Sequence, residues 1–131
     1  EALTSMERAF AIEPASRSNF TRRAAIYNSM GRYSQAIADM ERAISQAGND
    51  ADLWNNLCLY QSNAGLNDRA LLACERAIEL NPRMANAYAN KARAFERLGR
   101  EPEAIDYYNR ALALDRNLSF ARDGLRRLGA S

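Results

Sequence analysis

A pattern that recurs every 34 residues constrains the fold of this chain more than any other feature. Gly31, Gly65 and Gly99 are separated by this interval. Alanine fills two further columns at the same interval: Ala2, Ala36, Ala70 and Ala104, and then Ala9, Ala43, Ala77 and Ala111. The repetition predicts a stack of similar structural units, each of which buries its apolar face against its neighbours.

Each unit has the pattern of two helices joined at its glycine. Apolar residues recur at intervals of three and four, as in Ile37, Met40 and Ile44, which is typical of an amphipathic helix. Glycine suits the turn because it has no Cβ to oppose a left-handed backbone. The expected helix pairs are 17–30 with 34–46, 51–64 with 68–80, and 85–98 with 102–115. An all-α fold is therefore predicted.

The matched columns resemble those of a known family. In two successive units they are Trp54, Leu57, Ala70, Ala77 and Pro82, followed by Tyr88, Ala92, Phe95, Ala104, Tyr108 and Ala111. At this spacing the chain resembles the tetratricopeptide repeat family. Arg23 and Lys91 depart from the pattern because an apolar residue is usual there, and Cys58 replaces a small one. The resemblance implies a right-handed superhelical solenoid of antiparallel helix pairs.

The repeats divide the chain, which is expected to form a single domain. Residues 1–14 match only the second helix of a unit, and complete repeats are expected at 17–50, 51–84 and 85–118. Residues 119–131 have the pattern of a capping helix with apolar residues on one face and charged residues outside. Its apolar members are Phe120, Ala121, Leu125 and Leu128, and its charged ones are Arg122, Asp123, Arg126 and Arg127.

The resemblance also implies a function, which is to hold an extended peptide or partner segment in a concave groove lined by the first helices. The groove positions hold mainly amides and arginines: Arg22, Asn28, Asp52, Asn55, Asn56, Asn63, Asn86, Asn90, Arg93 and Arg97. An amide both donates and accepts, so it can bond to a peptide backbone, while arginine favours acidic side chains. The alternative is that these are simply solvated surface residues.

Some members of the family hold the C-terminal carboxylate of a heat-shock protein with two lysines, an arginine and two asparagines. The corresponding positions here are Thr21, Ala25, Asn56, Asn86 and Asn90, and only Asn56 fits. A buried carboxylate needs cationic donors to offset its desolvation. Carboxylate-clamp binding of a chaperone is therefore disfavoured.

The N-terminal half repeat lacks its usual partner helix. Leu3, Met6 and Phe10 would then leave an apolar flank open. This flank is expected to contact upstream residues or another chain. The alternative function is thus an assembly scaffold that self-associates through the flank, or the adaptor part of a larger protein.

Cys58 and Cys74 should lie level across the middle hairpin, as Ala24 does with Met40. They are either two small buried thiols or a disulfide, which requires Cα atoms within about 7 Å. Free thiols would fit the cytoplasm, and a disulfide would fit the periplasm or secretion. Because all basic residues except Lys91 are arginine, the composition favours a bacterial source with a GC-rich genome.

Several other classes of function are excluded. The formal charge is only +2 and no basic run occurs, so nucleic acid is not an expected partner. The chain has no histidine and no glycine-rich phosphate loop, so neither catalysis nor a cofactor is expected. Two cysteines alone fall short of a zinc site, and no apolar stretch is long enough for membrane insertion.

Overall fold

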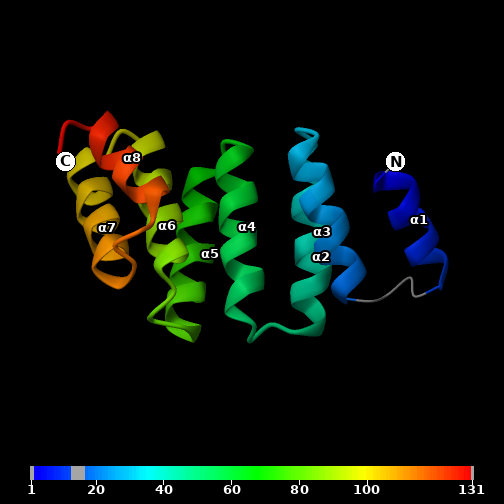
Figure 1. Ribbon diagram of the computed structural model, residues 1–131. Helices are drawn as coiled ribbons and strands as arrows, with labels where there is room; N and C mark the ends of the chain where they lie inside the picture. Colours follow the sequence, from blue (N-terminus) through cyan, green and yellow to red (C-terminus); the bar gives the residue numbers. More distant parts are fainter. Residues whose placement is uncertain (1, 13–16, 131) are drawn as a thin grey trace.

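The computed structural model describes residues 2–12 and 17–130, and the side chain of Ile12 lies outside the description. Eight helices account for the regular structure of these residues, and no strand occurs among them, so the all-α prediction is confirmed (Figure 1). Their bounds are α1 Ala2–Ile12, α2 Arg17–Ser29, α3 Tyr33–Gln46, α4 Ala51–Asn63, α5 Asn67–Leu80, α6 Ala85–Arg97, α7 Glu101–Leu114 and α8 Ser119–Arg127. The predicted end of the half repeat at residue 14 lies outside the described residues.

The predicted glycine turns join α2 to α3, α4 to α5, and α6 to α7. Gly31, Gly65 and Gly99 have φ angles of 76°, 83° and 77°, the left-handed conformation that glycine adopts without a Cβ penalty. In each turn the residue after the glycine donates its N–H to a carbonyl five residues earlier: Arg32 to Tyr27, Leu66 to Gln61, and Arg100 to Phe95. These bonds satisfy carbonyl groups at the end of each first helix, where the chain turns toward the second helix.

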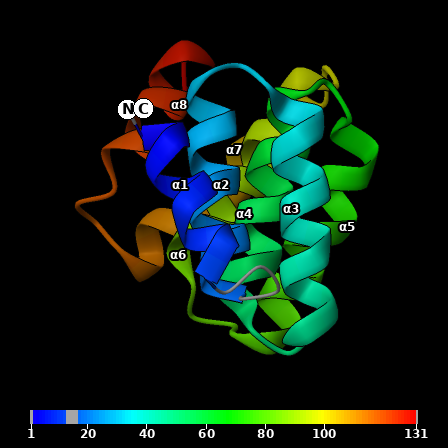
Figure 2. The ribbon, with the colours of Figure 1, turned by 90° about the vertical axis from the view of Figure 1, so that its right-hand side faces the viewer.

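The hairpins stack so that each one contacts its neighbours along the chain. Helix α3 packs on α4, α5 on α6, and α7 on α8, and Figure 1 shows the resulting row of helices. The alanine columns make close packing possible, since Ala36, Ala70 and Ala104 are completely buried. Among alternate helices, α4 packs on α6 and α6 on α8, and a hydrogen bond joins Asn63 of α4 to Asn28 of α2. The first helices are therefore drawn together on one side of the stack, its inner side, and Figure 2 shows α2 and α6 to the left of α3 and α5.

Two unusual charges in the repeats have partners 16 residues later, and Lys91 also pairs with Glu75 of α5 at 3.2 Å. The guanidinium of Arg23 makes two hydrogen bonds of 2.8 Å to Asp39, and Lys91 Nζ donates to the Tyr107 hydroxyl at 3.0 Å. Both pairs join the first helix of a hairpin to its second helix. The repeat period thus brings facing residues together, and each of these two pairs contains a charged residue where apolar residues are usual.

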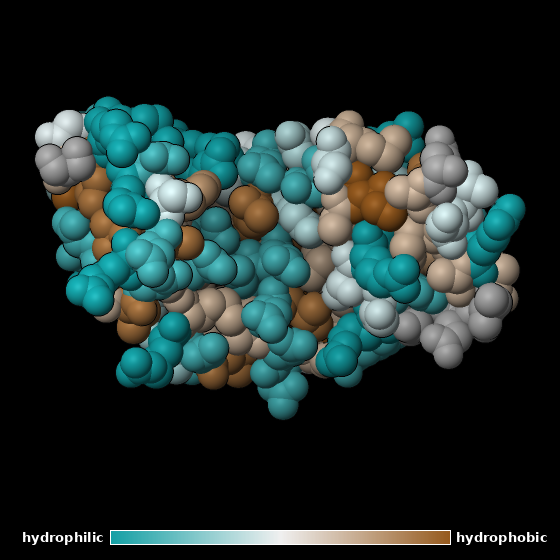
Figure 3. Space-filling view, viewed as in Figure 1, coloured by the Kyte–Doolittle hydropathy of each residue, from teal (hydrophilic) through white to brown (hydrophobic). Residues whose placement is uncertain are grey.

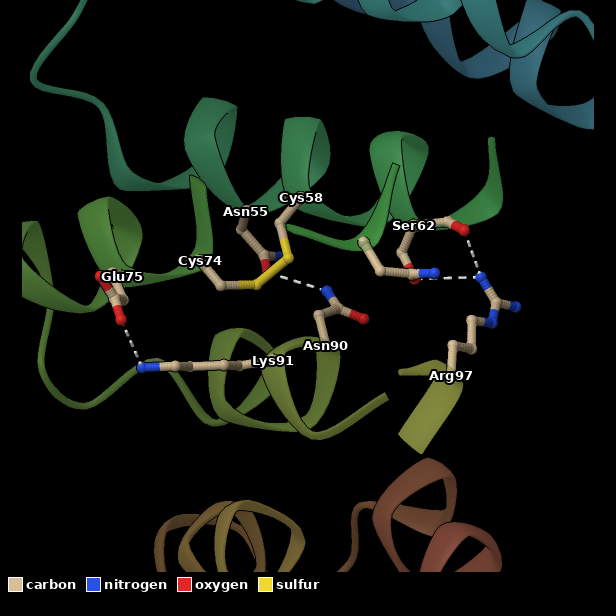
Figure 4. The surroundings of a disulfide bond; sticks show 9 residues. Asn55, Cys58, Ser62, Cys74, Glu75, Asn90, Lys91 and Arg97 are labelled. Carbon is tan, nitrogen blue, oxygen red and sulfur yellow. Dashed lines mark hydrogen bonds and ion pairs between the residues drawn. A yellow bond between two sulfur atoms is a disulfide. The ribbon is translucent and has the colours of Figure 1, made fainter. Parts of the chain in front are cut away.

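The middle hairpin carries a disulfide between Cys58 and Cys74, also 16 residues apart. The Cα atoms are 5.3 Å apart and both residues are completely buried between α4 and α5 (Figure 4). The alternative of two small buried thiols is therefore wrong for this structure, because the level placement brings the sulfurs into bonding range. The oxidising compartment that such a bond favours stays a prediction.

Helix α8 covers the end of the stack by packing on α7 and α6. Ala121 and Leu125 are buried against this end. Gly124 makes the approach close, since a Cβ built on it would lie only 2.3 Å from Cζ of Tyr108. The aromatic ring of Tyr108 therefore occupies the space that any other residue at position 124 would need.

Candidate interaction face

The predicted groove residues lie on α2, α4 and α6, the helices of the inner side. Along α6, for example, Asn86, Asn90, Arg93 and Arg97 follow one another at intervals of three and four, so they form one stripe. Figure 3 views the molecule from the side of α6 and α8 and shows hydrophilic side chains gathered over these helices. The structure therefore brings the predicted residues onto one polar face.

Four of the asparagines bond to one another rather than standing free. Asn63 Nδ2 donates to Asn28 Oδ1 at 2.9 Å, and Asn90 Nδ2 donates to Asn55 Oδ1 at the same distance. Each bond joins residues 35 positions apart, so it links one repeat to the next, and Figure 4 shows the bond between Asn55 and Asn90. Each pair uses one donor and one acceptor and leaves the remaining amide atoms for a ligand. We call these two hydrogen bonds the asparagine ladder. The sequence did not predict the ladder, because it depends on how far one repeat rotates relative to the next.

Other predicted residues keep their polar atoms unpaired. Within the described residues, the side chains of Arg22, Asp52, Asn56 and Asn86 make no hydrogen bond or ion pair. Asn56 is half-buried, whereas Asn86 is exposed. A half-buried amide without a partner has lost part of its hydration, and a ligand that bonds to it would restore that loss. Asn56 is thus the predicted groove residue that is best prepared for a ligand.

Charged side chains surround a depression of about 290 Å³ between α6 and α8. It is lined by Arg93, Glu96, Arg97 and Arg127. Arg97 Nη1 donates to the backbone oxygen of Ser62 at 2.6 Å, which ties α6 to α4 (Figure 4). Arg127 makes two hydrogen bonds of 3.0 Å to the Glu96 carboxylate.

These contacts shift the protonation of Glu96 and its neighbours. The hydrogen bonds from Arg127 are the largest cause that lowers the pKa of Glu96, and the bond from the Tyr108 hydroxyl at 2.7 Å adds to it. Burial, followed by the bond to Glu96, raises the pKa of Tyr108. Burial also lowers the pKa of Arg93, and repulsion from Arg97 acts in the same direction. Arg93 is therefore a cation in an unfavourable site.

Comparison with known proteins agrees with the repeat pattern. Two family models described as tetratricopeptide repeat match residues 19–50 and 59–119. The chain belongs to the tetratricopeptide repeat family.

Among curated proteins, it is 26% identical to anaphase-promoting complex subunit 3 of Schizosaccharomyces pombe over 122 residues. That match covers 93% of this chain and only 18% of the relative's length. Among solved structures, the first TPR domain of human RPAP3 has a TM-score of 0.83 at 23% identity and covers 88% of this chain and 91% of its own. The first TPR of Spaghetti (RPAP3), bound to the HSP90 peptide SRMEEVD, has a TM-score of 0.80 at 23% identity and covers 86% and 90%. These structures share the tetratricopeptide superhelix.

The positions of the carboxylate clamp lie on the inner face of this tetratricopeptide domain but offer little to a terminal carboxylate. Thr21 Oγ1 already donates to the Ser18 carbonyl, and Asn90 is bonded to Asn55. None of the clamp positions is cationic. The low affinity for a terminal carboxylate therefore stays a prediction from these side chains.

The sequence missed the contribution of the capping helix to this face. Arg127 was expected on the polar outer surface of α8, but it reaches Glu96 on α6. Phe120 was expected only as an apolar contact, yet its ring centre lies 5.0 Å from the guanidinium carbon of Arg93. Helix α8 begins 34 residues after α6, in register with the first helices, but it has 9 residues against the 13 of α6, so the repeat pattern alone did not locate its side chains.

The N-terminal flank is partly covered within the chain. Met6 is only 3% exposed, and Phe10 packs edge-on against Phe20 with ring centres 5.2 Å apart. Met6 therefore cannot contact a partner in this arrangement. An apolar depression of about 430 Å³ remains, lined by Ala2, Leu3, Ile26, Ser29 and Met30. Figure 3 shows a hydrophobic patch in this part of the surface, between α1 and α2. Self-association through Leu3 stays a prediction.

Two further features are absent from the described residues. No cluster of three or more histidine, cysteine or carboxylate side chains able to hold a metal occurs among them. No described helix is long and apolar enough to cross a membrane.

Proposed function

We propose that this chain is a non-catalytic protein–protein interaction module that holds an extended peptide along the inner face of α2, α4 and α6. The observation that carries the proposal is the half-buried Asn56, whose amide has no partner within the described residues and lies on the same face as the asparagine ladder. The peptide complex of the Spaghetti domain supports it, because the two share this fold.

The chemistry of the face favours recognition of a peptide backbone. A side-chain amide matches the N–H and C=O groups of an extended chain without selecting its side chains. Asn86 lies at the exposed start of α6, and Asn56 lies on α4, so the two contact points belong to successive repeats. The ladder between them fixes the spacing of the repeats before a ligand arrives, which reduces the ordering cost of binding.

A random-peptide library displayed on phage would test the proposal. Peptides selected on the wild-type protein should bind Asn56→Ala, Asn86→Ala about tenfold more weakly, because two hydrogen bonds are lost. Asn109→Ala, Asn49→Ala is the matched control, since both of these asparagines are exposed away from the face. Fluorescence anisotropy with the selected peptides gives the affinities.

If the two double variants bind the selected peptides with equal affinity, the inner-face site is ruled out. If selection yields no peptide and sedimentation shows a concentration-dependent dimer, the assembly function is favoured instead. In that case Leu3→Ser in the apolar depression should abolish the dimer.

A further inference from the structure

The depression between α6 and α8 contains more positive than negative charge. Three arginines line it, from two different helices, against the single carboxylate of Glu96. This imbalance is local, because the whole chain has 18 basic and 16 acidic residues. A hollow of about 290 Å³ with an excess of cations is suited to a small anionic group.

Two of the three arginines are already bonded to the protein. Arg127 makes its hydrogen bonds to Glu96, and Arg97 donates to the backbone and hydroxyl oxygens of Ser62. Arg93 differs, because no carboxylate of the described residues forms an ion pair with it. Its guanidinium instead lies over the ring of Phe120.

The surroundings of Arg93 favour the arrival of an anion. The residue is half-buried, and the repulsion from Arg97 and Arg127 exceeds the attraction of Glu96. A bound anion would offset both effects, since opposite charges attract strongly where water is partly excluded. Packing on the ring of Phe120 also limits the orientations of the guanidinium, so less entropy is lost when it forms hydrogen bonds.

We propose that Arg93, together with Arg97 and Arg127, forms a subsite for the carboxylate of an aspartate or glutamate side chain in a bound peptide. The inference rests on the proposed function, because Arg93 continues the stripe of Asn86 and Asn90 along α6. It differs from recognition of a peptide's C-terminus, for which the clamp positions of α2, α4 and α6 hold no cationic side chain. One arginine comes from α8 and two come from α6, so the subsite lies between these two helices.

Capped decapeptides provide a direct probe. The first alternates glycine with glutamate and carries an acetyl group and a C-terminal amide, and the second replaces every glutamate with the isosteric glutamine. A third, glutamine peptide has a free C-terminal carboxylate. Each is added to ¹⁵N-labelled protein at about 0.15 M salt, where distant surface charges are screened. The arginine Nε–Hε signals report on the subsite, and the backbone amides of α2 and α4 report on the rest of the face.

The proposal expects the glutamate peptide to shift the Nε–Hε signals of Arg93, Arg97 and Arg127, and both glutamine peptides to leave them unchanged. Arg93→Gln should weaken the glutamate peptide about tenfold or more. Arg126→Gln is the matched control, because it removes the same charge from an exposed position on α8. Glu96→Gln should strengthen binding, a change of opposite sign that mere loss of structure would not produce. Circular dichroism confirms that each variant remains helical.

Three results would overturn the subsite: equal shifts with the glutamate and capped glutamine peptides, a shift only with the free C-terminus, or equal weakening by Arg93→Gln and Arg126→Gln. The readouts separate this failure from failure of the proposed function. If the backbone amides of α2 and α4 respond to every peptide while the arginine signals do not distinguish glutamate from glutamine peptides, the groove is supported and the subsite is ruled out. If only the arginine signals respond, the subsite is supported and binding along the extended groove is ruled out.

Discussion

At the scale of single residues, the first repeat contains a buried ion pair where the second repeat is apolar. Asp39 is only 1% exposed and accepts both hydrogen bonds from Arg23. The corresponding residues one period later are Leu57 and Ala73, both buried. A buried pair contributes little to net stability, but removing one partner leaves the other charge buried and unpaired.

Arg23→Ala should therefore destabilise the protein by about 3 kcal/mol, at the lower end of the range for broken buried pairs because Arg42 still lies 3.4 Å from Asp39. Urea unfolding followed by circular dichroism measures the loss. The control is the double variant Arg23→Leu, Asp39→Ala, which copies Leu57 and Ala73 of the second repeat. It should recover most of the stability, and a double variant as unstable as Arg23→Ala would contradict this explanation.

Some side-chain contacts could be predicted from the sequence and others could not. The two groups differ in the structural feature that determines the contact. The facing pairs 16 residues apart, including Cys58 with Cys74, follow from the repeat period and the glycine turn. The asparagine ladder and the contact of Arg127 with Glu96 depend on small rotations between successive helices. The pattern of apolar residues fixes those rotations only approximately, so the polar pairs were missed although the face itself was predicted.

At the scale of helices, α8 is held by a polar bridge as well as by packing. Glu96 on α6 accepts from the Tyr108 hydroxyl on α7 and from Arg127 on α8, so one carboxylate joins three helices. The lowered pKa of Glu96 means that its ionised form stabilises the fold above its ordinary pKa of 4.5. This contribution is lost as the pH falls below 4.5 through the lower pKa of the folded state.

Glu96→Gln should thus cost about 1 kcal/mol at neutral pH, a modest value because Arg127 is half exposed. The difference from wild type should shrink as the pH is lowered from 7 to 3, and thermal melts across this range measure it. Glu103→Gln is the control, since Glu103 pairs with Arg100 at an exposed site and should change stability little at any pH. A constant deficit of Glu96→Gln at every pH would argue against the bridge.

At the scale of the whole molecule, stability depends on the middle hairpin. In a stack of this kind each repeat is stabilised mainly by its immediate neighbours. Helices α4 and α5 connect the first repeat to the third, and the disulfide lies between them. Loss of that bond should therefore weaken both ends of the stack and not only the hairpin that contains it.

Cys58→Ala, Cys74→Ala should reduce the free energy of unfolding by about 3 kcal/mol, the value expected for a closed loop of this size. Hydrogen exchange should show lower protection in α2 and α6 as well as in α4 and α5. Cys58→Ala, Cys74→Met should lose less, since it copies the buried pair of Ala24 and Met40 in the first repeat. Unchanged protection in α2 and α6 would show that the repeats are independent.

The bonds 35 residues apart all lie on one side of the stack. They join Asn28 to Asn63, Asn55 to Asn90 and Ser62 to Arg97, from one first helix to the next. Such a row of hydrogen bonds resists lengthening of this side of the stack more than of the opposite side. The solenoid should consequently flex by spreading α3, α5 and α7, while the distances between α2, α4 and α6 stay nearly constant.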